Sequence, residues 1–224
     1  MRIRSFIVAY ALVLAILLFA DRRPGSAPSD RYSHVIDLTA APATAKPSVA
    51  TSSAVSDSTT RIIAPAALIP GTWTAGQIPA DRLVAPMVVL ELNTATAPNT
   101  SSQLSLDDIA EWENQHGIIP QGAVVAIRQP VASPDPSTTP FPISREAALF
   151  LLEARYTIGF AVETPVNFAS DRTLARQLSL HGDYVVEQAA HFTSLPATGS
   201  LIIVAPEKSK QSGEPPVRIL AMVR

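Results

Sequence analysis

The chain has 224 residues with 17 basic and 19 acidic side chains, a net charge of −2. This length predicts one domain, and this charge balance excludes a basic, nucleic-acid-binding surface. The absence of cysteine excludes disulfides, thiolate nucleophiles and cysteine-ligated metals. The 20 prolines exceed the share of an average chain and indicate segments outside helices and central strands.

The N-terminus has the pattern of an export signal. Arg2 and Arg4 precede an apolar run from Phe6 to Ala20. As a helix this run spans about 22 Å, less than the roughly 30 Å hydrocarbon core, which is typical of a signal-peptide h-region. Gly25–Ala27 supplies small residues for cleavage, whereas the charged residues directly after the run also suit an uncleaved anchor. We expect 1–23 to be a signal peptide or membrane anchor, and the protein to be exported to the cell envelope, periplasmic or membrane-anchored.

Residues 24–60 are rich in Ala, Pro, Ser and Thr. Such a segment buries too little apolar area to offset the entropy of ordering it, so we expect a flexible linker. Tyr32–Thr39 interrupts it with β-branched and aromatic residues, which predicts a strand at 35–39. The remaining residues, 61–224, are enough for one hydrophobic core.

Within 61–224, strand patterns alternate with helix patterns, which predicts an α/β fold. Ser105 is the expected N-cap of a helix that ends at His116, because two aspartates follow in the first turn. Two further helices are expected at 144–154 and 171–180. Strands are expected at 82–92, 122–128, 160–163, 184–187, 200–205 and 217–223, and a proline-rich loop at 129–142.

Four segments of this domain carry a resemblance to a known family. They are Ile78–Leu92 (IPADRLVAPMVVLEL), Gly159–Asn167 (GFAVETPVN), Val186–Pro196 (VEQAAHFTSLP) and Gly213–Val223 (GEPPVRILAMV). In this order they resemble the bacterial kynurenine formamidase and cyclase family of metal-dependent amide hydrolases. The resemblance implies a single domain with a swivelling β/β/α fold, in which the strand at 35–39 opens the sheet, and it implies a homodimer.

The family binds zinc or manganese through an H-x-G-T-H-x-D-A-P motif with a further histidine just after it, and the metal activates a water and polarises the scissile carbonyl. Aligning its A-P with Ala64–Pro65 places the motif on Asp57–Ala67, with Thr60 retained. Asp57, at the first histidine, is the one position that still offers a ligand. The second histidine, the aspartate and the last histidine are replaced by Arg61, Ile63 and Ala67. The resemblance therefore implies that the metal site is lost, and we predict no cofactor.

The family's second catalytic group is a histidine about twelve residues before a glutamate. The glutamate corresponds to Glu187, whereas the histidine position is Ala175, followed by Arg176. Glu187 is the remaining catalytic candidate, and a structural carboxylate at a strand end is its alternative interpretation. We predict that Glu187 faces the emptied pocket and contacts Arg61, whose guanidinium would compensate the buried charge.

Three further residues are candidates for the same pocket. His191 lies four residues after Glu187, and Glu163 ends a strand. Trp73 could stack on an aromatic ligand or anchor its own loop on the core. No G-x-S-x-G elbow and no glycine-rich phosphate loop occurs in the sequence.

Two classes of function remain open. The first is an exported, catalytically inactive cyclase-like pseudoenzyme that acts by binding or assembly, with a small aromatic ligand, and that contacts the membrane if the N-terminal segment stays uncleaved. The second is a working arylformamidase-like hydrolase of non-peptide C–N bonds, which converts N-formylkynurenine to kynurenine and formate with zinc or manganese. The second class needs at least three converging ligands. The available donors are His34, Asp37, Asp57, Glu163, Glu187 and His191.

Overall fold

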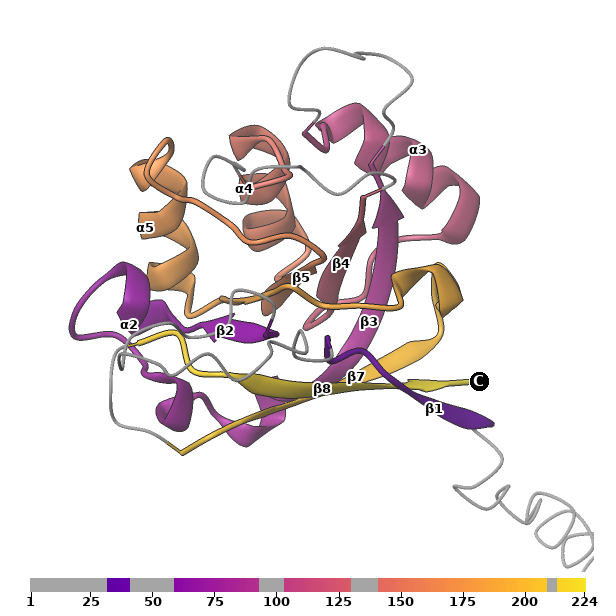
Figure 1. Ribbon diagram of the computed structural model, residues 1–224. Coiled ribbons are helices and arrows are strands. Elements are labelled where there is room, and N and C mark those ends of the chain that lie inside the picture. The colour runs from indigo at the N-terminus through magenta and orange to yellow at the C-terminus, as the bar shows by residue number, and fades with distance from the viewer. Residues whose placement is uncertain (1–31, 41–58, 93–102, 130–140, 209–212) are drawn as a thin grey trace, which may run out of the picture. The chain divides into compact units, whose positions relative to one another are not determined.

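A mixed β-sheet organises the part of the chain that the structure describes (Figure 1). The computed structural model describes residues 32–40, 59–92, 103–129, 141–208 and 213–224, and His34–Arg224 forms one compact unit. The predicted signal or anchor at 1–23, most of the linker and Asp57 lie outside the described residues. None of the described helices is long and apolar enough to cross a membrane.

Four parallel strands form the middle of the sheet: β3 (Val84–Glu91), β4 (Val124–Arg128), β5 (Gly159–Val162) and β6 (Tyr184–Glu187). Parallel neighbours need crossover connections, and three helices supply them: α3 (Leu106–His116), α4 (Arg145–Ala154) and α5 (Arg172–His181). All three helices lie on one side of the sheet (Figure 1). The carboxyl ends of the four strands consequently meet at one edge.

The remaining strands pair in the antiparallel sense. They are β1 (His34–Asp37), β2 (Arg61–Ile63), β7 (Ser200–Pro206) and β8 (Val217–Val223), and the sheet order is β1-β8-β7-β3-β4-β5-β6-β2. The chain also forms a short helix, α2 (Pro65–Leu68), and 3₁₀ turns at Ala75–Gln77, Ala80–Arg82 and Phe192–Ser194. Strand β2 falls where the sequence analysis expected only the metal-binding motif.

Backbone hydrogen bonds connect the two ends of the sheet, so that it curls on itself. Strand β2 pairs with β6 on one side, and on the other the Ile62 amide donates to Pro215 O at 3.1 Å. The Val217 amide in turn donates to Thr60 O at 3.0 Å. After β1, Leu38 donates to the Ile219 carbonyl at 3.0 Å and accepts from the Ala190 amide at 2.8 Å.

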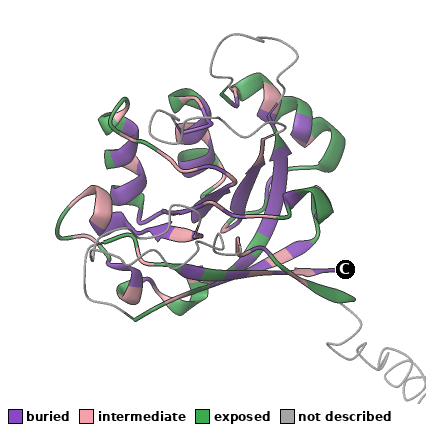
Figure 2. Ribbon diagram, viewed as in Figure 1, coloured by how far each residue is buried: buried purple, intermediate pink, exposed green. Residues whose placement is uncertain are grey.

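The curled sheet separates two hydrophobic cores, and its central strands are buried (Figure 2). Side chains alternate between them along each strand, so Ile62 belongs to one core and Ile63 to the other. The first core includes Leu38 and Phe192. The second includes Phe160 and lies between the sheet and the helices. Burial on both faces explains why the parallel strands read as nearly continuous apolar runs.

The start of α3 confirms the prediction that Ser105 is its N-cap, and the helices and strands together confirm the α/β fold class. Ser105 Oγ accepts from the Asp108 amide at 3.2 Å, and the Asp108 carboxylate accepts from the Ser105 amide at 2.8 Å. The side chains of Ser144 and Asp171 cap α4 and α5 by accepting from the amides of Ala147 and Leu174, without the reciprocal bond. These three helices form where expected because each start is determined by residues within one turn.

A buried contact between Arg82 and Asp183 lies at the amino end of β6. Arg82 Nη2 lies 2.7 Å from Asp183 Oδ1, and the Asp183 side chain is 1% exposed. Arg82 also donates to Gly182 O at 3.1 Å, and the Tyr184 hydroxyl donates to Arg82 O at 2.9 Å. Burial raises the pKa of Asp183 to about 8, although Arg82 opposes this shift.

We predict that Asp183 makes the protein less stable as the pH rises. Its pKa in the folded chain, about 8, exceeds the ordinary value of 3.8. The folded state therefore holds this proton more tightly than the unfolded chain, and the free energy of unfolding falls as the pH rises between these two values. Urea unfolding of Asp183→Asn across this range should show a flatter profile. Equal slopes in both proteins would contradict the assignment.

Candidate functional site

The carboxyl ends of the parallel strands form a polar edge. Ligands of α/β sheets bind at such an edge. The polar residues that end these strands or follow them directly are Glu91, Arg128, Gln129, Glu163, Thr164, Glu187 and Gln188.

A buried threonine hydroxyl ties this edge to the loop that enters β2. Thr60 is fully buried. Its Oγ1 accepts from the Ala40 amide at 2.7 Å and donates to the Gln188 carbonyl at 2.7 Å. Thr39 forms an antiparallel bridge with Ala189 beside it. One hydroxyl therefore satisfies backbone groups of two segments that are far apart in sequence.

Glu187 lies at the end of β6, and its side chain is held by the backbone. The residue is 6% exposed, and its Oε2 accepts from the Val166 amide at 2.9 Å. Burial raises the pKa of Glu187, and the nearby Glu214 raises it further, whereas the Val166 amide and Arg61 lower it. The carboxylate is thus a buried acceptor with a strengthened affinity for a proton.

The predicted ion pair between Arg61 and Glu187 does not form. The register of β2 and β6 places the two residues opposite each other, so their side chains leave the same face of the sheet. None of the ion pairs within the described residues joins them, however, and Arg61 is only half-buried. Glu187 already accepts a backbone amide, and a half-exposed guanidinium keeps much of its hydration. Only the longer-range attraction remains, as the pKa of Glu187 shows.

Glu163 lies on the same edge, one strand away from Glu187. Its Oε2 accepts from the Gln129 amide at 3.0 Å, and the Thr164 hydroxyl donates to Gln129 Oε1 at 2.8 Å. Burial raises the pKa of Glu163, and the Gln129 amide and the charge of Arg128 oppose it. His191 is exposed, with φ of 63°, in the segment after β6. In the described part of the chain no hydrogen bond or ion pair joins it to either glutamate.

The structure separates Trp73 from Glu187, which corrects the prediction of a shared pocket. Trp73 lies at the amino end of β6, where its ring faces Gly182, and Glu187 ends the same strand. A Cβ on Gly182 would meet the Trp73 ring at 2.8 Å, and the φ of +75° at this glycine also disfavours other residues. The Arg82 guanidinium lies 5.7 Å from the ring centroid. Trp73 therefore anchors its own loop.

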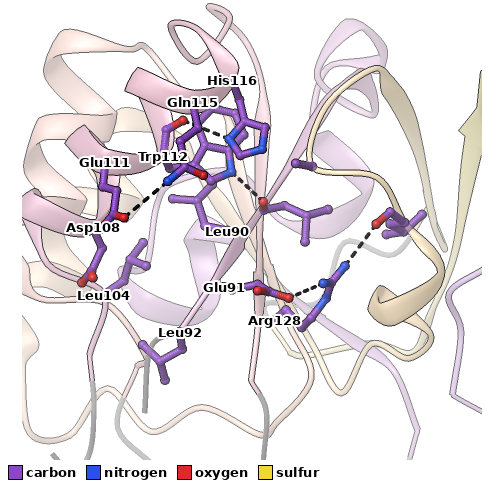
Figure 3. Close-up of a pocket in the computed structure, with 13 residues that line it drawn as sticks. Leu90, Glu91, Leu92, Leu104, Asp108, Glu111, Trp112, Gln115, His116 and Arg128 are labelled. Carbon is purple, nitrogen blue, oxygen red and sulfur yellow. Dashed lines mark hydrogen bonds and ion pairs between the residues drawn. The ribbon is translucent and has the colours of Figure 1, made fainter. Parts of the chain in front are cut away.

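A cavity of about 590 Å³ opens between α3 and the carboxyl ends of β3 and β4 (Figure 3). Trp112 forms part of its wall and donates from Nε1 to Val89 O at 2.9 Å. The His116 ring stacks on Trp112 at 4.8 Å between centroids, which explains this helix-end histidine. Glu91 and Arg128 form an ion pair at the rim, and Arg128 Nη2 donates to Phe192 O at 2.7 Å.

A second cavity, of about 380 Å³, lies between α2 and α5. Its lining residues are Ala67, Leu68, Ile69, Phe168, Ala169, Arg172, Ala175 and Arg176. Neither of these two cavities is lined by the residues predicted to form the pocket, namely Glu187, Glu163, His191, Arg61 and Trp73.

Comparison with known proteins decides the family. The profile of the family described as "Putative cyclase" matches residues 30–167. The chain belongs to the cyclase family. No curated protein matches the chain in sequence.

Solved structures of cyclase-type hydrolases share the fold. Isatin hydrolase A from Labrenzia aggregata, bound to benzyl benzoate, is 26% identical over 85% of this chain and 93% of its own, with a TM-score of 0.66. Isatin hydrolase A from Ralstonia solanacearum is 24% identical over 85% and 92%, with a TM-score of 0.67. A "potential metal-dependent hydrolase with cyclase activity" is 20% identical over 85% and 98%, with a TM-score of 0.60.

Among the described residues, those that stand at the family's metal-binding positions by resemblance, Arg61, Ile63 and Ala67, do not fit a metal ion. Within the described ranges, no group of three or more His, Asp or Glu side chains could hold one. Ile63, where the motif has its aspartate, is 2% exposed and packs in the core between sheet and helices. Arg61 lies two residues before Ile63, so its positively charged side chain leaves the same face of the strand.

Sequence reasoning missed the two cavities and part of the polar edge. The pairs Glu91–Arg128 and Thr164–Gln129 each join the ends of neighbouring parallel strands. Their positions directly at predicted strand ends could have revealed them, because such ends converge at one edge. The cavity between α2 and α5 has no comparable local pattern.

We predict that Thr60→Val destabilises the fold. Valine keeps the shape but leaves the Ala40 amide and the Gln188 carbonyl without their buried partner. The expected loss is roughly 1–3 kcal/mol in the free energy of unfolding, measured by urea denaturation. Thr60→Ser is the matched control, because it retains the hydroxyl and should lose less. Equal losses in the two variants would assign the effect to packing of the methyl group.

Proposed function

We propose that this cyclase-family protein acts by binding rather than by metal-dependent hydrolysis. One observation carries the proposal: at three of the family's four metal-ligand positions, and at its proton-transfer histidine, the side chains present have no atoms that coordinate a cation. The four positions, by resemblance, are those of Arg61, Ile63, Ala67 and Ala175. A catalytic zinc keeps three protein ligands.

The carboxylates that remain at this edge offer no catalytic pair. Glu187 is a buried acceptor already used by the Val166 amide, and Glu163 is used by the Gln129 amide. Neither contacts a serine, histidine or lysine that could become a nucleophile or transfer a proton, within the described residues. Both carboxylates therefore stabilise the ends of their strands.

The alternative function is amide hydrolysis of the arylformamidase type. The likeness to isatin hydrolase A at 26% identity favours it. It requires a donor set that includes residues outside the described ranges, such as Asp57, in place of the missing ligands.

We predict that the purified protein, loaded with zinc or manganese and desalted, retains well under one equivalent of metal. The same sample should not hydrolyse N-formylkynurenine or isatin. Metal is measured by atomic emission and turnover by absorbance, with an isatin hydrolase carried through the same steps as the positive control. Stoichiometric metal together with turnover would establish the hydrolase and overturn the binding proposal.

The proposal includes a location and an assembly. The arginines and the apolar run of residues 1–23 support export to the cell envelope, with the domain periplasmic or held at the membrane. The linker would let a retained domain reach away from the membrane. The family resemblance supports a homodimer.

We predict that cell fractionation places the full-length chain in the membrane or another envelope compartment. Deletion of Phe6–Ala20 should move it to the cytoplasm, because the apolar run is the expected export determinant. Immunoblots of both forms, beside cytoplasmic and envelope marker proteins, make the measurement. A soluble cytoplasmic full-length chain would refute export.

A further inference from the structure

We propose that the cavity between α2 and α5 binds a small organic anion, with an apolar body and one carboxylate. This inference rests on the proposed function, because ligand binding in this cavity would replace the metal chemistry that the same region has lost. Two of its lining residues, Ala67 and Ala175, occupy positions where the family resemblance expects histidines. Alanine side chains at these two positions leave space that histidine side chains would fill.

The cavity has fixed walls. Ser179 on α5 donates its hydroxyl to the Pro65 carbonyl of α2 at 2.9 Å, and Thr72 contacts the same hydroxyl at 3.1 Å. These bonds hold the two helices side by side, as Figure 1 shows. Leu68, Ile69 and Phe168 supply apolar surface. A volume of about 380 Å³ suits a small ligand, since ligand sites span roughly 300–1,000 Å³.

The charge of the cavity is positive and uncompensated. Arg172 and Arg176 line it, one helical turn apart on the same face of α5. Neither guanidinium forms an ion pair within the described residues, and no acidic side chain lines the cavity. The arginines that do pair with carboxylates in the described part of the chain are Arg82, Arg128, Arg145, Arg155 and Arg218.

These features together select the chemistry of the ligand. Two like charges four residues apart on a helix repel each other, so an anion between them removes an unfavourable interaction. A guanidinium binds a carboxylate through two parallel hydrogen bonds. The apolar walls favour a ligand that brings hydrophobic surface into the cavity, which an inorganic anion does not have.

The test uses 1-naphthoate as the probe on the full-length protein, with binding followed by naphthalene fluorescence and by equilibrium dialysis. We expect naphthoate to bind at least about tenfold more tightly than the neutral 1-naphthamide, equivalent to about 1.4 kcal/mol. The double variant R172Q/R176Q should lose this preference. Arg224→Gln removes the same charge outside the cavity and is the matched control. Ala175→Leu should block both probes by filling the cavity.

The outcomes separate this inference from the proposed function. Naphthoate binding that is equal in R172Q/R176Q and the parent protein would overturn the inference, as would equal affinity for the amide. Both arginines are exposed, so these variants remain informative even if Ala175→Leu fails to fold. Each titration is repeated with EDTA and with added zinc. Binding that disappears with EDTA and returns with zinc would instead overturn the proposed metal-free function.

Discussion

Closure of the curled sheet by β2 is the constraint on which the rest of the structure depends. This strand has three residues, yet it bonds to β6 on one side and to the segment before β8 on the other. So short a strand gains little stability from its own ladder. The buried hydroxyl of Thr60 therefore matters, because it fixes the entry to β2 against the Ala40 amide and the Gln188 carbonyl.

The same closure explains how the cyclase scaffold persists with different side chains at the metal-binding positions. Thr60 is retained in the motif, and its role here is to satisfy backbone groups. By the resemblance, Arg61, Ile63 and Ala67 stand at positions whose side chains coordinate the metal in the family. The Ile63 side chain is buried in the core between sheet and helices. Burial of this apolar side chain stabilises the fold without a cation. The fold depends on the backbone of this short segment and on the Thr60 hydroxyl, whereas metal binding depends on its other side chains. Those side chains can therefore change while the fold remains.

The two edges of the parallel sheet have different electrostatics. At the amino end of β6, Asp183 and Arg82 form one buried pair beneath Trp73. At the carboxyl end, Glu187 and Glu163 each accept a backbone amide and remain without a direct ionic partner among the described residues. Burial of an acid raises its pKa at both edges. Only the carboxyl edge, however, lies where the parallel strands direct a ligand.

The sequence alone determined the features that depend on neighbouring residues. Ser105, Ser144 and Asp171 start their helices through contacts within one turn, and residue type alone shows that Ile63 and Ala67 carry no coordinating atoms. Tertiary structure decided what depends on distant segments. It placed Trp73 away from Glu187, left Arg61 without its expected ion pair, and brought α2 beside α5 to form a cavity. Such contacts join residues about a hundred positions apart, as Ser179 and Pro65 show, and no local pattern encodes which surfaces the folded chain brings together.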